Sequence, residues 1–448
     1  MSNKNLECLP AFDFIDYEHN VQINTNTVNL SINGKEYTKP CNVVLDLTSQ
    51  PKIYVEFSSE GISQFDILSV FNDQNKLDGF TINGKNIEGY FVYSGKSLNS
   101  SDENIIRWTP RYEPVTTLGN DQTLMGSVVF HIFNFVEFLS NKRKFVKKDD
   151  TDYAIEELTL KDSEWHVKIK SLFETHDQFK ILNSSGGYQA THIGCISKTD
   201  SSLFSGKEAT NLLNALRLIL SFAKGCWCVP VCPIGKDSKG AAVWECWSSP
   251  KDYWQKPLSW FDPYNSDQLS IIFRGFMELW NEKLWCETLN DVIYWYLNAN
   301  NSSRGIDAGV ILTQTAIERL SFQYTVNEKK LIESQGFKDL KASDKFRLLF
   351  SSLNIPLDIP SHLTEMKDLS KKIKWLDAPH ALTEIRNSLV HPDHKYRKRV
   401  SNTYYEAWNL GLWYLEMSIL AVCGYSGKYA NRLNSKWKGE VENVPWTD

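Results

Sequence analysis

The stretch Trp254-Gln-Lys-Pro-Leu-Ser-Trp-Phe-Asp-Pro263 marks the point at which the chain changes character. It is rich in aromatic residues and contains Pro257 and Pro263. Because proline disfavours both a helix interior and a central strand, the stretch is predicted to be a turn-like connection. Short β-like segments precede this stretch, and helical patterns follow it. We therefore predict an α+β protein in two parts, residues 1–262 and residues 263–448.

The first part carries the alternation typical of half-buried strands. Val28–Ile32 alternates between apolar and polar residues, and Asn33-Gly34 after it is a typical hairpin turn. Ile53–Phe57 and Tyr90–Tyr93 predict further strands. Residues 1–262 should therefore form a β-rich lobe, built like a sandwich or a barrel.

One helix is expected within this lobe. Ser205-Gly-Lys-Glu208 has the spacing of a capping box, in which the serine hydroxyl and the glutamate carboxylate each bond a free backbone N–H. The helix that follows should cover about residues 205–225 and end near Gly225, because glycine accepts the left-handed conformation that closes a helix.

The second part, residues 263–448, is expected to be an antiparallel helical bundle. Apolar residues recur there at spacings of three and four, which predicts helices. The helical stretches are 269–296, 307–322, 343–353, 379–390 and 408–422. In the last of them Trp408, Leu412, Leu415, Ile419 and Val422 form one apolar stripe.

Composition limits the classes of function. The 448 residues carry a net charge of −5, so a nucleic-acid site must be a local basic patch. The N-terminal residues have no signal-peptide pattern, and the longest uncharged apolar stretch, Gln122–Val136, is too short for a membrane helix. The nine cysteines are scattered, which is typical of a reducing compartment. We expect a cytoplasmic protein without a membrane partner.

Four cysteines raise the alternative of a zinc site. Cys226, Cys228, Cys232 and Cys246 follow the spacing Cys-x-Cys-x3-Cys, whereas zinc knuckles use paired Cys-x2-Cys units. The alternation of these thiols with Trp227 and valines suits a strand with buried cysteines. We therefore expect neither a metal nor a cofactor.

The segment Arg386-Asn-Ser-Leu-Val-His-Pro392 combines a guanidinium, an amide and an imidazole at the end of a predicted helix. Residues five apart on a continuous helix point about 140° away from each other. Because Pro392 disfavours helical backbone at the residue before it, the helix should stop near Val390 and His391 can turn toward Arg386. A guanidinium and an imidazole together can bind a phosphodiester and move a proton.

A basic run follows. Between Arg386 and Val400 there are five Lys or Arg residues and a single acid, Asp393, which gives a formal charge of +4. Such a patch in an acidic chain favours a polyanionic ligand. The structural alternative is an ordinary helix end, with Arg386 paired to Glu384 or Asp393 and the remaining charges solvated.

These residues resemble a known family. Arg386–His391 matches the Arg-x4-His signature of HEPN ribonucleases, including the polar residue after the arginine, and lies late in a helical region as it does there. The stretch Cys423-Gly-Tyr-Ser-Gly-Lys-Tyr-Ala-Asn-Arg432 is similar to the ending of ApeA-type HEPN proteins. Those proteins join a β-rich N-terminal region to a C-terminal HEPN domain in bacterial anti-phage defence. The resemblance covers roughly residues 263–435.

The resemblance implies a metal-independent endoribonuclease that acts in abortive infection. In this reading Arg386, Asn387 and His391 are the catalytic residues. The residues that would hold the RNA are His394, Lys395, Tyr396, Arg397, Lys398 and Arg399.

The partners implied are RNA and a second copy of the chain. The sequence does not distinguish tRNA, mRNA and rRNA, and it leaves room for a phage-derived trigger. We expect a homodimer or a larger homo-oligomer, because HEPN sites are commonly shared across a two-fold axis and because Trp408, Trp413 and Tyr414 suggest surplus apolar surface on the last helix. The alternative function is a non-catalytic HEPN dimerisation module with the β-rich lobe as a sensor or binding domain. A nucleotidyltransferase partner within the chain is excluded, because no acidic pair follows Gly126-Ser127 at the required distance.

Overall fold

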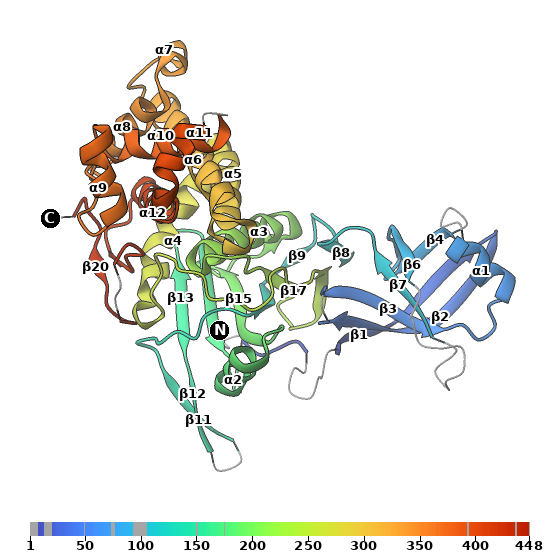
Figure 1. Cartoon of the computed structure of the whole chain (residues 1–448). Coiled ribbons are helices and arrows are strands. Elements are labelled where there is room, and N and C mark those ends of the chain that lie inside the picture. Colours follow the sequence, from blue (N-terminus) through green and yellow to red (C-terminus); the bar gives the residue numbers. More distant parts are fainter. Residues whose placement is uncertain are drawn as a thin grey trace.

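The computed structural model has the predicted α+β architecture, with two large antiparallel sheets followed by a helical region (Figure 1). The fold class is therefore confirmed. The structure describes residues 8–12, 20–48, 50–72, 77–92, 105–148, 151–173, 175–391, 394–434 and 437–447.

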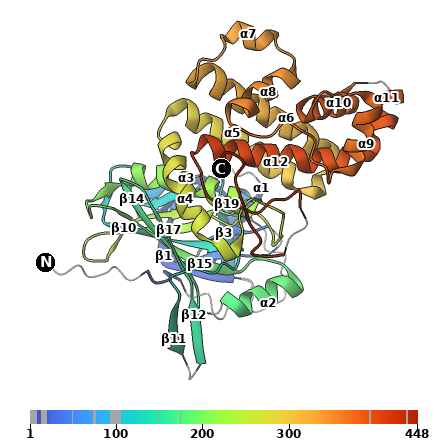
Figure 2. The same cartoon turned by 90° about the vertical axis from the view of Figure 1, so that its left-hand side faces the viewer.

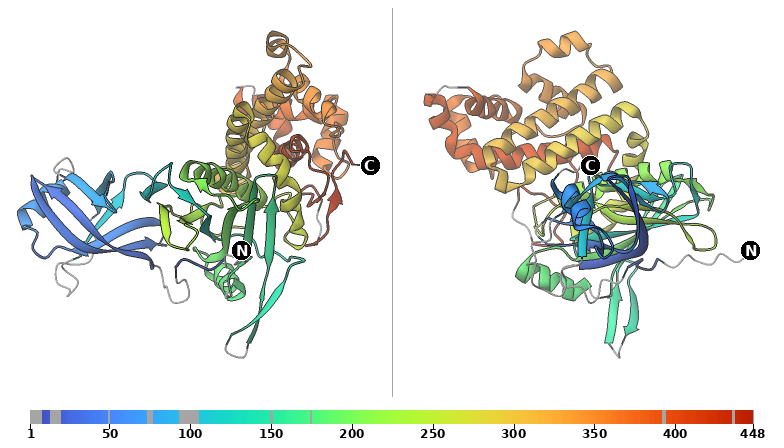
Figure 3. Two further views of the ribbon diagram at one scale, coloured as in Figure 1. Left: turned by 180° about the vertical axis from the view of Figure 1, so that it is seen from behind. Right: turned by 90° about the vertical axis from the view of Figure 1, so that its right-hand side faces the viewer.

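The first sheet, sheet A, has seven antiparallel strands in the order β5-β4-β1-β2-β3-β7-β6 and curls around its apolar face (Figures 1 and 3). The strands are β1 (Asn20–Ile32), β2 (Lys35–Asp46), β3 (Lys52–Ser58), β4 (Leu77–Ile82), β5 (Lys85–Asn86), β6 (Gly89–Val92) and β7 (Ile105–Pro110). Asn33 and Gly34 join β1 to β2 with positive φ angles of 51° and 74°, as the expected hairpin turn requires.

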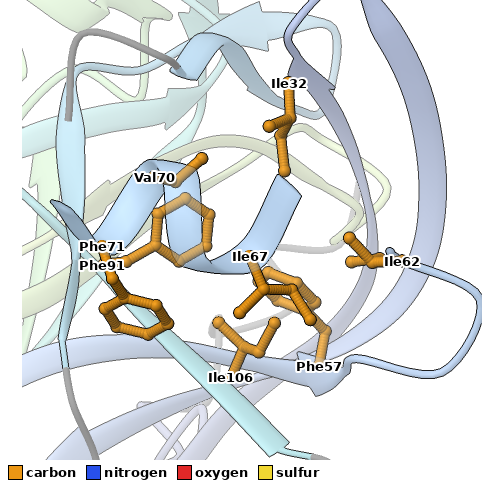
Figure 4. A pocket seen from close by; sticks show the side chains of 8 residues that line it. All are labelled: Ile32, Phe57, Ile62, Ile67, Val70, Phe71, Phe91 and Ile106. Carbon is orange, nitrogen blue, oxygen red and sulfur yellow. The ribbon is translucent and has the colours of Figure 1, made fainter. Parts of the chain in front are cut away.

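Helix α1 (Gln64–Asn72) closes the apolar face of sheet A. Ile67, Val70 and Phe71 of this helix face Phe57, Phe91 and other apolar residues of the strands around a void of about 10 Å³ (Figure 4). A void of this size has room for one water molecule at most, so it belongs to the core.

The second sheet, sheet B, lies between sheet A and the helices (Figure 1; Figure 3, left). Its antiparallel order is β13-β14-β15-β10-β17-β18-β8. The strands are β8 (Val115–Leu118), β10 (Ser127–Phe133), β13 (Glu157–Lys161), β14 (Trp165–Ser171), β15 (Ala190–Lys198), β17 (Pro230–Lys236) and β18 (Ala242–Trp247). The smaller elements are β9 (Leu124–Met125), β11 (Lys144–Lys148), β12 (Thr151–Ile155), β16 (Phe204–Ser205), α2 (Thr175–Ser185), β19 (Lys428–Tyr429) and β20 (Glu442–Asn443). β11 and β12 form a hairpin that projects away from sheet B (Figure 2).

Strand β10 is buried on both faces because it separates two cores. Val128, Phe130 and Ile132 lie in the core shared with the helices. Val129 and Phe133, which alternate with them, lie in the core shared with sheet A. This double burial explains why apolar residues of this segment occur at both alternating sets of positions, interrupted only by His131 between Val128 and Phe133.

Helix α3 (Gly206–Lys224) confirms the predicted capping box. The Glu208 N–H donates to Ser205 Oγ, and Glu208 Oε2 accepts from the Ser205 N–H at 2.8 Å. Gly225 ends the helix with φ 81°. The β-rich part also contains α1 and α2, so the expectation of a single helix there was wrong.

Nine further α-helices follow in the described part of the chain. They are α4 (Asp267–Trp280), α5 (Lys283–Asn300), α6 (Ile306–Phe322), α7 (Ser334–Asp339), α8 (Ala342–Ser352), α9 (Thr364–Ile373), α10 (Ala378–Val390), α11 (His394–Val400) and α12 (Tyr404–Val422). All five predicted helical stretches are present, and the first is divided into α4 and α5. The short helices α7, α9 and α11 were not predicted. Helices α7 and α11 contain few apolar residues, whereas Met366, Leu369 and Ile373 of α9 have a helical spacing that could have revealed it.

Helix α12 corrects one sequence-based expectation. Every side chain from Ala407 to Leu420 is buried within this chain, including Trp408, Trp413 and Tyr414. The helix runs through the middle of the helical region with other helices around it (Figure 2). Trp408, Trp413 and Tyr414 therefore supply core packing and do not form an apolar surface for a second copy.

The stretch at Trp254–Pro263 connects the two parts through tight packing. The side chains of Trp260 and Phe261 are buried in the core that sheet B shares with the helices. Beyond the connection, Ser270 of α4 donates a hydrogen bond to the Thr159 carbonyl of β13 at 2.7 Å. Along the chain, the large sheets thus precede this stretch and the helices of the second part follow it. In space, one apolar core extends across it.

None of the helices in the described residues is long and apolar enough to cross a membrane.

Candidate functional site

The candidate site is carried by α10, whose start is fixed by local interactions. Asp377 caps the helix by accepting the His380 N–H at 2.9 Å, and Pro379 occupies the first turn. Asp377 also binds Arg347 of α8 through two oxygens, at 2.6 and 3.1 Å. These contacts hold the helix in one orientation against its neighbours.

The end of α10 is where the sequence predicts it. Val390 is the last helical residue, and the His391 N–H makes the last helical bond to the Asn387 carbonyl at 2.9 Å. His391 itself has extended backbone, with φ −104° and ψ 146°, and its side chain is exposed. The imidazole therefore leaves the helix and is accessible to a ligand.

Arg386 is half-buried and lies four residues, about one turn, before Val390. Its Nη1 donates to Asn387 Oδ1 at 3.4 Å, and it has no carboxylate partner among the described residues. The alternative pairing with Glu384 is therefore not found, while Asp393 lies outside the described residues. No hydrogen bond joins Arg386 to His391 in the described part of the chain, so a ligand would have to bridge them.

Sequence analysis missed two residues that support the motif. Ser388 is buried, and its hydroxyl lies 3.3 Å from the Tyr404 hydroxyl at the start of α12. Gln314 of α6 donates to the Leu382 carbonyl of α10 at 2.6 Å. Neither contact could be predicted from a local sequence pattern, because its two partners are far apart in the sequence.

Helix α11 follows the motif and carries the predicted RNA-binding residues. Arg397, Lys398 and Arg399 are exposed. Arg397 lies 3.6 Å from Asp307 Oδ2 at the start of α6, and Arg399 donates to the Lys372 carbonyl of α9 at 3.4 Å. The side chains of the other three predicted residues, His394, Lys395 and Tyr396, lie outside the described part of the structure.

The chemistry available at this surface follows from these side chains. Arg386 can donate two parallel hydrogen bonds to phosphate oxygens because no carboxylate in the described part of the chain pairs with its guanidinium. His391 presents an exposed imidazole, a group that can donate or accept a proton in catalysis. The cations of α11 add a positive potential beside them.

The four cysteines do not form a metal site. No group of three or more potential metal ligands is found in the residues that the structure describes. Cys232 donates from Sγ to the Ser248 carbonyl at 3.2 Å, and burial raises the pKa of the Cys228 thiol to about 12. Both thiols are therefore protonated residues of the protein interior.

A second concave feature lies where the β-rich part meets the helices. A pocket of about 250 Å³ is bounded by the segment 255–258, the end of α5 and the start of α12. Tyr405 is exposed at this pocket, while Trp408 is held by a 2.7 Å bond from its Nε1 to the Ala299 carbonyl. The pocket and the motif thus share the first turns of α12.

Fold and site together define an α+β protein in which a helix of the helical part ends in a basic segment that contains an arginine and a histidine.

The comparisons with known proteins identify its relatives. The family model for the YopA central domain matches residues 120–257, and that for the YopA C-terminal domain matches residues 282–443. The SPbeta prophage-derived uncharacterized protein YopA of Bacillus subtilis (strain 168) is 30% identical over 337 residues, which cover 73% of this chain and 74% of that protein.

The chain therefore belongs to the YopA family. The first domain match contains sheet B apart from β8, and the second contains the motif on α10. Sheet A precedes both matches. No solved structure matches the chain significantly.

Proposed function

We propose that the protein is a metal-independent endoribonuclease of the HEPN type. The observation that carries the proposal is the end of α10, where His391 leaves the helix five residues after an Arg386 that has no carboxylate partner among the described residues. The resemblance of Arg386–His391 to the HEPN signature supports the same function.

In this mechanism the RNA supplies its own nucleophile. The 2′-oxygen forms a bond to the adjacent phosphorus while the bond from phosphorus to the 5′-oxygen breaks. His391 moves the proton in the reaction, and Arg386 stabilises the charge that develops on the phosphate oxygens. The proton lost by the 2′-hydroxyl is balanced by the proton gained at the departing 5′-oxygen. The products are a 2′,3′-cyclic phosphate and a 5′-hydroxyl.

Asn387 has a positioning role in this proposal. Its Oδ1 accepts from Arg386 Nη1 at 3.4 Å, which favours one orientation of the guanidinium. Its carbonyl holds the His391 N–H in the last bond of the helix. Asn387 thus contacts both charged partners of the reaction, one through its side chain and one through its backbone.

The cellular role that we propose is cytoplasmic defence against phages by abortive infection, with RNA held along α11 and a phage-derived trigger. A relative encoded in a prophage supports a role of the family in the conflict between phages and bacteria. We also propose a homodimer with two motifs facing one cleft. This proposal now depends on the HEPN resemblance, because the aromatic residues of α12 are buried within the chain. Sedimentation of the active species as a monomer would contradict it.

The second candidate is a non-catalytic HEPN module in which the β-rich part acts as a sensor. The observation that favours it is the pocket between residues 255–258 and α12, because a ligand there would contact both parts of the molecule. In that case Arg386 and His391 would be residues of an ordinary helix end.

The test is cleavage of total RNA by the purified full-length chain in excess EDTA. Wild type should produce fragments with 2′,3′-cyclic phosphate ends, and His391→Ala should lose at least about a hundredfold in rate, as expected when a general acid or base is removed. His362→Ala is the matched control, because His362 is also an exposed histidine of the helical part. Equal cleavage by wild type and His391→Ala would refute the mechanism and favour the sensor function.

A further inference from the structure

The fold brings the C-terminal end of α9 next to α11, although the two segments are separated by the whole of α10. The contact between them is the 3.4 Å hydrogen bond from Arg399 Nη2 to the Lys372 carbonyl. Figure 2 shows α9, α10 and α11 together at one edge of the helical region. We call the six cationic residues at this contact the α9–α11 surface. They are Lys371, Lys372, Lys374, Arg397, Lys398 and Arg399.

The α9–α11 surface is exposed and only partly neutralised. All six side chains are exposed to solvent. In the described part of the chain they form two ion pairs, Lys371 with Asp368 at 2.8 Å and Arg397 with Asp307 at 3.6 Å. Four cations remain without a carboxylate partner there. A net charge of +4 is thus concentrated at one place in a chain whose total charge is −5.

Helix stabilisation accounts for only part of this charge. Lysines in the last turn of a helix interact favourably with its dipole, which explains Lys371 and Lys372. Arg397, Lys398 and Arg399 lie in the last turn of α11 and interact with its dipole in the same way, whereas Lys374 lies beyond the end of α9 with φ 63°. Bringing like charges together costs free energy, so a polyanion that neutralises them would bind favourably.

We propose that the α9–α11 surface binds the phosphate backbone of single-stranded RNA and extends the substrate site from His391 onto α9. The identity of this ligand rests on the proposed function. The motif and the surface are continuous, because α11 begins three residues after His391 and its last turn contacts α9. Single-stranded RNA fits best because the 2′-oxygen must rotate into line with the bond that breaks, which a rigid duplex resists. The lysines of α9 would contact phosphates away from the cleaved bond.

The experiment measures binding of a fluorescent 2′-O-methyl RNA 12-mer, which cannot be cleaved because it lacks the nucleophile. The test variant is Lys372→Gln with Lys374→Asn, since asparagine tolerates the left-handed backbone at position 374. The matched control is Lys338→Gln with Lys341→Gln, two exposed lysines at α7 and α8. Arg399→Gln tests the α11 side, and thermal unfolding checks that each variant is folded.

Each phosphate contact to a single strand contributes about 0.7 to the dependence of log affinity on log salt concentration. The α9 variant should therefore reduce this slope by about 1.4 and weaken binding about tenfold at low salt, while the control should match wild type. An unchanged slope and affinity in the folded α9 variant would overturn the proposal. Lysine-dependent binding to vesicles of phosphatidylglycerol and phosphatidylcholine, with no binding of the RNA, would assign the surface to a membrane instead.

The two proposals can fail separately. If the uncleavable RNA binds through the α9 lysines but His391→Ala cleaves like wild type, the α9–α11 surface stands and the catalytic proposal fails. If cleavage needs His391 but the α9 variant binds and cleaves like wild type, the catalytic proposal stands and the proposed role of the α9–α11 surface fails.

Discussion

Arg432 and Glu416 form an ion pair in the interior of the helical part. Arg432 Nε lies 2.9 Å from Glu416 Oε2 and Nη2 lies 2.5 Å from Oε1, with side-chain exposures of 1% and 0%. Tyr296 donates to the same carboxylate at 2.6 Å, and Asn300 Oδ1 accepts from Arg432 Nη1 at 3.1 Å. The network ties the segment after α12 to α5 and to the carbonyl of Leu258.

Removing one partner of this pair should therefore destabilise the protein strongly. Arg432→Met would leave the Glu416 carboxylate buried without its cation, which typically costs about 3–5 kcal/mol. Urea unfolding should show the loss as a lower midpoint. The control is Arg274→Met, because Arg274 is 78% exposed and pairs with Glu278 on the same helix. A loss of similar size in both variants would show that burial of the pair is not the cause.

Arg386→Lys should abolish RNA cleavage although the positive charge is kept. An ammonium group cannot reproduce the planar two-point contact of a guanidinium with phosphate oxygens. We expect a fall in the maximal rate of at least about a hundredfold, with RNA affinity changed by a few-fold at most. Single-turnover cleavage at saturating RNA separates the two quantities. Full activity of Arg386→Lys would mean that Arg386 acts only as a charge.

The stability of the protein should fall as the pH is lowered from about 6.5 to about 3. Burial lowers the pKa of His131 to about 3 and that of His192 to about 3, both from an ordinary value of 6.5. His131 is held neutral, because Nδ1 donates to the Val231 carbonyl and Nε2 accepts the Ala11 N–H at 3.1 Å. Below pH 6.5 the unfolded chain binds protons that the folded chain excludes, which costs up to about 1.4 kcal/mol per pH unit for each histidine.

The pH dependence can be assigned with variants. His131→Gln should reduce the slope of unfolding free energy against pH between 3 and 6.5, since glutamine does not titrate. His176→Gln should leave the slope as it is, because the His176 side chain is 73% exposed. A wild-type stability that does not change over this range would contradict the buried neutral state of both histidines.

Gly275→Ala should destabilise the contact between α4 and the end of α12. A Cβ at Gly275 would lie 1.8 Å from the Cys423 carbonyl oxygen, so the backbone of one helix end would have to move. Overpacking of this kind costs about 1–3 kcal/mol. In Gly336→Ala the added Cβ would meet only the flexible side chain of Ile332, at 3.1 Å or more, so this variant should be neutral or slightly stabilising. Thermal unfolding of the two variants compares these outcomes.

Features with local causes could be predicted from the sequence. The turn at Asn33-Gly34, the capping box of Ser205 and Glu208, and the end of α10 at Val390 all have the predicted form. Each depends on the backbone preferences and hydrogen bonds of residues within a few positions of one another. The same preferences place His391 outside the helix, so this part of the candidate site follows from the sequence.

The roles of the large apolar residues could not be predicted in the same way. The stripe from Trp408 to Val422 was correctly assigned to a helix, yet its period does not reveal that α12 is also covered on its other faces. The sequence pattern therefore suggests surface positions for Trp413 and Tyr414, whereas both are buried. The spacing of apolar residues predicts that a segment is helical. It does not predict which of the helix's other faces are buried, because that depends on the elements packed around it.

The sequence by itself determined the α+β fold class, the helix boundaries around Arg386 and His391, and the basic character of α11. Only the tertiary structure decided that Arg432 pairs with Glu416 inside the core and that Lys372 lies beside Arg399. The physical reason is the range of the interactions involved. Caps, turns and the effect of a proline act between neighbours in the chain, whereas burial and electrostatic contacts depend on distance in space, which chain packing sets.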